Sequence, residues 1–163
     1  MQTISKKIAL CGVTCALGVI IMGLGGLIPI ATFCSPMLCG LLSIPVLKKC
    51  GSRLTLVWYA ALSILSVLIS PDKEAAGVYV FLGWYPVVQP YLNRLKLPLR
   101  LTAKFLIFNG DIILLYSILL YIFPIYSLKQ EFAGLGFAML GTLLLLGNLC
   151  FFLFDRILSK AKL

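Results

Sequence analysis

Long apolar runs alternate with short polar segments along the whole chain. Six of these runs could form membrane-spanning helices, at about residues 8–28, 30–47, 54–69, 75–92, 101–123 and 132–154. A helix of about 20 apolar residues is long enough to cross the hydrocarbon core of a bilayer. The pattern therefore predicts an all-α integral membrane bundle of six transmembrane helices, which forms a single membrane domain over residues 1–163.

Prolines divide two of these predicted spans. Pro36 and Pro45 lie within the second span, and Pro86 and Pro90 lie in the inner half of the fourth. Proline has no N–H to donate and its ring clashes with the preceding turn, so it kinks or breaks a helix. We therefore expect an interrupted second helix and a fourth helix that is kinked or broken near its inner end.

The basic side chains indicate how the helices are oriented. If the N-terminus lies inside the cell, Lys73 and Lys129 fall in outer segments and the other twelve of the 14 basic residues fall in inner segments. These twelve are Lys6, Lys7, Lys48, Lys49, Arg53, Arg94, Lys96, Arg100, Lys104, Arg156, Lys160 and Lys162. By the positive-inside rule, this distribution predicts a multi-pass protein of the cell membrane with both termini in the cytoplasm.

Composition narrows the classes of function. Hydrophobic residues make up 61% of the chain and charged residues 12%, against about 25% charged residues in soluble domains, so a soluble fold is excluded. The net charge of +9 is spread over the inner segments, which predicts the lipid bilayer and not a nucleic acid as partner. Histidine is absent and no nucleophile–base pair or phosphate-binding loop is present. We therefore expect no catalytic site, metal or cofactor, and no enzymatic activity.

The fifth predicted span carries a carboxylate, Asp111, near its middle. A charge at that depth is costly in lipid, so the side chain should face protein or water and is a candidate functional group. Asn109 lies close to it in the sequence, and Asn148 lies at a similar depth in the sixth span, so these side chains meet if the two spans pack together. The alternative role is a structural hydrogen bond between helices. Lys104, two turns below Asp111, is expected to extend to the inner headgroups.

Aromatic side chains complete the predicted substrate pocket. Tyr79 and Trp84 in the fourth span and Tyr116 in the fifth are candidates for its wall. Together with the aspartate and the two asparagines they form the predicted substrate-binding set. The acidic residues Asp72 and Glu74, in the outer loop before the fourth span, fit either a solvated loop or part of a lid.

The first predicted span begins with KKIALCGVTCALGVII, in which Ala9, Gly12 and Ala16 share one helix face. Small residues on one face let another membrane helix approach closely. In this opening, in its length and in its six spans with both ends inside, the chain resembles the S components of energy-coupling factor transporters. The resemblance implies a substrate-binding subunit for the uptake of a vitamin-like small molecule. It also implies that a transmembrane coupling subunit docks on this face and that separate ATPase subunits supply the energy.

The resemblance also gives a role to the first outer loop, which gates an outward-facing pocket in that family. Here the loop contains Gly25, Gly26 and Pro29. No substrate-specific motif is present, and two other functions fit the same architecture. One is a non-transporting membrane scaffold of the rod-shape-determining type, and the other is a membrane enzyme or its accessory. A co-purifying small molecule favours the transporter subunit, whereas co-purifying cytoskeletal or cell-wall proteins favour the scaffold.

The distribution of basic residues makes the topology testable by cysteine labelling. Single cysteines would replace Ser5, Ser52, Lys73 and Lys129 in a variant that lacks the six native cysteines. A membrane-impermeant maleimide should label positions 73 and 129 in intact cells, and positions 5 and 52 only after the cells are opened. Labelling of position 52 from the outside of intact cells would overturn the topology.

Overall fold

The described part of the chain is built from α-helices. A computed structural model describes residues 4–25, 32–121 and 137–161. The helices are α1 (Ile4–Gly25), α2 (Cys34–Cys50), α3 (Ser52–Ile69), α4 (Lys73–Leu82), α5 (Tyr85–Leu92), α6 (Leu97–Tyr121) and α8 (Phe137–Lys160). Each predicted span overlaps one helix in the described residues, except the fourth, which is divided into α4 and α5. The prediction of an all-helical chain is therefore confirmed for these residues.

Three of the described helices are long and apolar enough to cross a membrane. They are α1, α3 and the Leu97–Ile118 part of α6. Large apolar side chains are exposed on these helices, including Ile8, Ile64 and Phe105. An exposed apolar surface of this extent is typical of helices that face lipid. Length, hydropathy and exposure thus agree with a membrane protein.

Helix α2 lies at the centre of the bundle, in contact with α1, α3, α4, α5 and α8. Its small residues make these close approaches possible, because a side chain added at Gly40 would collide with the ring of Phe154 on α8. The Cys39 thiol donates a hydrogen bond to the Gly18 carbonyl of α1. Apolar cores form on either side of α2, one with α1, α3 and α4, the other with α4, α5, α6 and α8.

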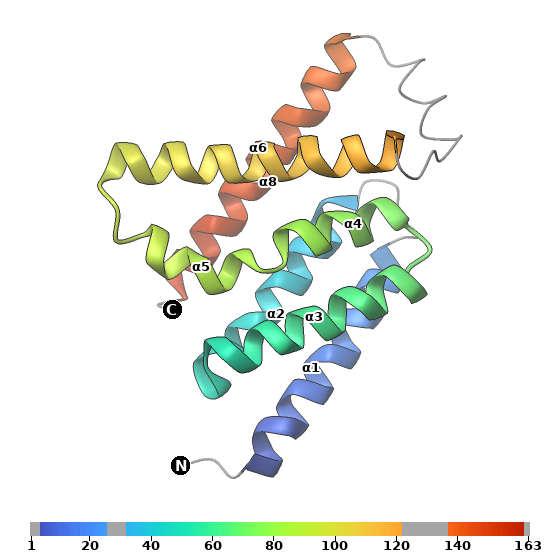
Figure 1. Cartoon of the computed structure of the whole chain (residues 1–163), viewed down its shortest axis with the longest axis vertical. Helices are drawn as coiled ribbons and strands as arrows, with labels where there is room; N and C mark the ends of the chain where they lie inside the picture. The colour runs from blue at the N-terminus through green and yellow to red at the C-terminus, as the bar shows by residue number, and fades with distance from the viewer. Residues whose placement is uncertain (1–3, 26–31, 122–136, 162–163) are drawn as a thin grey trace.

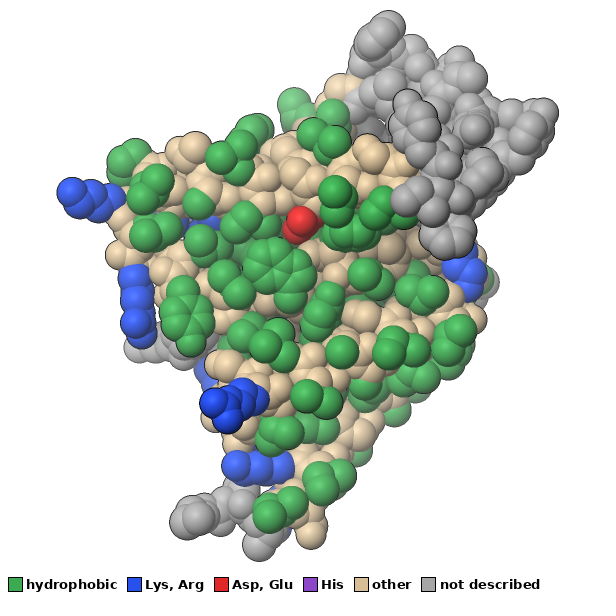
Figure 2. Space-filling model, in the orientation of Figure 1, with side chains coloured by type: hydrophobic (Ala, Val, Ile, Leu, Met, Phe, Trp, Pro, Cys, Tyr) green, Lys and Arg blue, Asp and Glu red, His purple; other side chains and the backbone are tan. Residues whose placement is uncertain are grey.

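The segments that were predicted to lie on the inner side gather at one end of the bundle. In Figure 1, α1 begins and α8 ends at this end, which also holds the α2–α3 turn and the α5–α6 connection. Figure 2 shows basic side chains along this border and an apolar surface between the two ends. The Lys48 ammonium group donates to the Ala161 carbonyl, which ties the end of α2 to the end of α8. The helices therefore run alternately up and down. Their orientation relative to the cytoplasm stays a prediction.

The expected interruption of the second helix is wrong, because α2 runs without a break from Cys34 to Cys50. Pro36 is in the first turn, where a helix N–H has no partner to lose. Pro45 removes a single backbone bond, and α2 is packed on several sides, so tertiary contacts hold the helix together.

The expected break in the fourth span is confirmed, but it lies in the middle of the span, at Gly83 and Trp84. Pro86 has no N–H for the carbonyl four residues earlier, so the helix ends there. The Tyr59 hydroxyl of α3 donates to the carbonyl of Val80 just before the break. A side chain at Gly83 would collide with the Tyr59 ring, so glycine permits this contact.

Helix boundaries differ from the apolar runs at the basic end. Helices α1 and α6 begin at Ile4 and Leu97, each four residues before the predicted start, and α8 ends at Lys160, six residues after the predicted end. Polar residues can continue a helix beyond the end of its apolar run, so the run alone underestimates the length of the helix. The extension of α8 matters most, because it places Asp155 on a helix rather than in a polar tail.

Candidate functional site

A buried ion pair joins α6 to α8 near the basic end. The Nζ atom of Lys104 lies 2.8 Å from both carboxylate oxygens of Asp155 and 2.7 Å from the Oδ1 atom of Asn93. Lys104 is only 7% exposed. The expectation that this lysine extends to the headgroups is therefore wrong, because a carboxylate on the neighbouring helix holds its ammonium group inside the bundle.

Two side chains of α5 complete the network around Asp155. The Tyr85 hydroxyl donates to its Oδ1 atom over 2.6 Å. The Gln89 amide nitrogen lies 3.3 Å from the same oxygen and 2.7 Å from the Ser159 hydroxyl of α8. Both α5 side chains are buried. A buried charge pair is stable only when hydrogen bonds satisfy its remaining polar atoms, so this network fixes three helices relative to one another.

Asn109, Asp111 and Asn148 were predicted to meet, and the structure brings together only the two asparagines. The amide nitrogen of Asn109 lies 3.1 Å from the Oδ1 atom of Asn148, and the reciprocal distance is 3.2 Å. Each nitrogen also donates to the carbonyl four residues earlier on its own helix, that of Phe105 or Leu144. This reciprocal amide pair satisfies its own polar atoms within the protein, as an apolar medium requires.

Asp111 lies apart from the amide pair. It is two residues after Asn109 on α6, so the two side chains point about 200° apart around the helix. Its side chain is half-buried, and the Oδ2 atom is buried with no hydrogen-bond partner among the described residues. A carboxylate oxygen in that position is costly unless something binds to it.

The structure distributes the predicted aromatic residues over different surroundings. Tyr79 is fully buried, with its ring 5.9 Å from that of Tyr59. Trp84 is half-buried at the break between α4 and α5. The Tyr116 hydroxyl donates to Glu74 in the first turn of α4, so Glu74 contacts the bundle and does not belong to a wholly solvated loop. The structure thus brings Asn109 to Asn148, and Tyr116 to an acid that was assigned to the outer loop.

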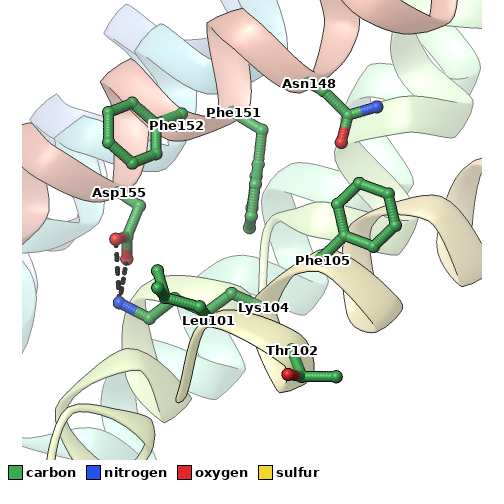
Figure 3. A pocket seen from close by; sticks show the side chains of 8 residues that line it. All are labelled: Leu101, Thr102, Lys104, Phe105, Asn148, Phe151, Phe152 and Asp155. Carbon is green, nitrogen blue, oxygen red and sulfur yellow. Dashed lines mark hydrogen bonds and ion pairs between the residues drawn. The ribbon is translucent and has the colours of Figure 1, made fainter. Parts of the chain in front are cut away.

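A cavity of about 490 Å³ lies between α6 and α8 (Figure 3). It is lined by Leu101, Thr102, Lys104, Phe105, Asn148, Phe151, Phe152 and Asp155. The ion pair marks one end, and Asn148 and Phe105 lie toward the other. Of the predicted substrate-binding residues, Asn148 is the one that lines this cavity. Among the described residues, no group of three His, Cys, Asp or Glu side chains is placed to hold a metal ion.

Four of the residues predicted for docking and gating lie on α1. Ala9, Gly12 and Ala16 are exposed on this helix. Gly25 is its last residue and is buried, and a side chain there would collide with Ser35 at the start of α2. The remaining two gating residues, Gly26 and Pro29, lie outside the described residues.

Sequence reasoning missed the residues that hold the network together. Tyr85 and Gln89 are four residues apart on α5, and Asp155 and Ser159 are four residues apart on α8. Pairs at this spacing share a helix face. Two such polar pairs occur in segments that were predicted to reach the same membrane surface. This pattern could have predicted a polar contact between the two helices.

Comparison with known proteins gives no assignment. No protein-family model, no curated protein and no solved structure matches this chain.

The ion pair makes a testable contribution to stability. Lys104→Met should leave the Asp155 carboxylate buried without a counter-ion and lower the free energy of unfolding by about 3 kcal/mol. Thermal or denaturant unfolding of the detergent-solubilised protein measures this change. Lys160→Met removes an exposed lysine from α8 and should leave stability close to that of the wild type. Equal stability of the Lys104→Met variant and the wild type would contradict a stabilising role of the pair.

Proposed function

We propose that the chain is the substrate-binding membrane subunit of an ATP-driven uptake transporter of the energy-coupling factor type. It lies in the cell membrane with both termini in the cytoplasm and binds a vitamin-like small molecule. A transmembrane coupling subunit and separate ATPase subunits supply the energy. The observation that carries this proposal is the exposed face of small residues on α1.

That face is exposed in the described part of the protein. Ala9, Gly12 and Ala16 are exposed, and apart from the neighbouring residues of α1 no described atom lies within 4 Å of the position that a Cβ atom would take at Gly12. Beside Ala9, a shallow groove of about 340 Å³ is lined also by Lys6, Leu10, Val13 and Lys49. A partner helix could approach the backbone of α1 closely here, because membrane helices associate mainly through such packing.

Asp111 supports a substrate site on the opposite part of the bundle. The hydrogen-bonding capacity of Asn109, Asn148 and Tyr116 is used within the protein, whereas the Oδ2 atom of Asp111 has no described partner. We therefore assign the binding of a polar or cationic group of the substrate to Asp111. The paired asparagines join α6 to α8, and Tyr116 joins α6 to α4. The buried hydroxyl of Tyr79 also has no described partner.

The docking face can be tested by adding bulk. Gly12→Leu and Ala16→Leu should abolish co-purification with the coupling subunit, because leucine side chains hold two helix backbones apart. Folding and melting temperature should change little, since nothing described lies near Gly12. Gly110→Leu is the matched control, because its Cβ position is equally open but lies on α6. Unchanged co-purification of the Gly12→Leu/Ala16→Leu double variant would rule out this face.

The role of Asp111 can be tested by removing its charge at constant size. Asp111→Asn should keep the melting temperature of the wild type and lose most of the co-purifying small molecule, as measured by native mass spectrometry after gentle solubilisation. Asp111→Glu retains the carboxylate and is the control. Asp111→Leu removes the carboxylate altogether and should also lose the co-purifying small molecule. Wild-type retention of the small molecule by the Asn variant would return Asp111 to a structural role.

A further inference from the structure

A groove runs between α6 and α8 at the basic end of the bundle. Its inner part is the cavity shown in Figure 3. Toward the helix ends it continues into a hollow of about 410 Å³, which is lined by Asn93, Arg100, Leu101, Lys104, Phe152, Asp155, Arg156 and Ser159. The two hollows share four lining residues and therefore form one continuous surface.

The two parts of this groove differ in chemistry. The inner part is walled by the apolar side chains of Leu101, Phe105 and Phe152, with Phe151 between the helices (Figure 3). From Asn148 to Asp155 the groove follows α8 for seven residues, or about 10 Å. The outer part carries the two arginines. The inner part of the groove is therefore mostly apolar around the ion pair, and the outer part is cationic.

The positive charge of the outer part is not neutralised by the described residues. Asp155 is taken by Lys104, so this pair contributes no net charge. Within the described residues, neither Arg100 nor Arg156 lies within ion-pair distance of a carboxylate. Three cations and one anion line this part of the groove, which leaves a local charge of about +2.

We propose that this groove binds an anionic phospholipid. Its phosphate lies between Arg100 and Arg156, where guanidinium groups offer several donors to phosphate oxygens. One acyl chain follows the apolar wall from Leu101 to Phe105. The buried ion pair beneath holds α6 and α8 at the separation that keeps the groove open.

A phospholipid fits this surface better than a soluble anion or a protein helix. A soluble anion would make no use of the apolar wall. A partner helix would place an apolar surface against the arginines, which would be costly without an acidic residue. Basic pockets between membrane helices are suited to anionic headgroups, and the predicted inner side is the one at which such lipids occur. The proposal rests on a membrane location and not on the transported substrate.

Competition between lipids tests the proposal. The full-length protein would be reconstituted into nanodiscs that contain equal amounts of phosphatidylglycerol and phosphatidylcholine, and its retained lipids identified by native mass spectrometry. The wild type should retain phosphatidylglycerol in preference to phosphatidylcholine. The Arg100→Gln/Arg156→Gln variant should lose this preference by about tenfold or more, because each basic side chain near the membrane surface adds to the attraction.

Control variants separate specific binding from general charge and from misfolding. Lys49→Gln/Arg53→Gln removes the same charge from the α2–α3 turn and should keep the preference. Arg100→Lys/Arg156→Lys keeps the charge and should retain most of it, which also shows that substitutions at these positions fold. An equal loss in both glutamine variants, or no preference in the wild type, would overturn the proposal. Cross-linking of the groove to another polypeptide in native membranes, in place of lipid, would overturn it as well.

Discussion

Polar groups inside an apolar bundle must find their partners within the protein, and this constraint organises the second half of the chain. The Lys104–Asp155 pair is stable because Tyr85, Gln89 and Asn93 satisfy atoms that water would otherwise solvate. These groups come from α5, α6, α8 and the connection after α5. The network therefore determines the relative positions of the three helices. In this way it also determines the separation of α6 and α8 that forms the groove.

Helix α2 separates this part of the bundle from the part that carries the proposed docking face. On one side it packs against α1 and α3 with small residues, and on the other it accepts the Phe154 ring against Gly40. Helix α2 is thus the element that connects α1 to α8.

The sequence predicted what depends on local pattern. Apolar runs located the helices. Depth counted along two helices placed Asn148 level with Asp111, but the partner that Asn148 meets in the structure is Asn109. The sequence-based prediction was wrong where contacts between helices determine the structure. Pro45 was expected to interrupt a helix that packing holds together. Lys104 was expected at the headgroups because its partner Asp155 follows directly after the predicted sixth span. Apolar runs mark the lipid-facing length of a helix and not its ends, so partners just beyond a run are missed.

The distinction between satisfied and unsatisfied polar atoms narrows the search for a functional group. Asn109 and Asn148 satisfy each other, Tyr116 is bonded to Glu74, and Lys104 is paired, so each contributes to the fold in the structure as it stands. Asp111 and Tyr79 differ from these residues, because each has a buried oxygen without a described partner, a state that costs free energy. Of the two, Asp111 carries the carboxyl group, whose charged form is the more costly to bury. Such a group is compatible with a stable protein where a bound ligand supplies the missing hydrogen bond or charge. Asp111 is therefore the strongest candidate for substrate recognition. Asn109 and Tyr116, on the same helix, join α6 to its neighbours.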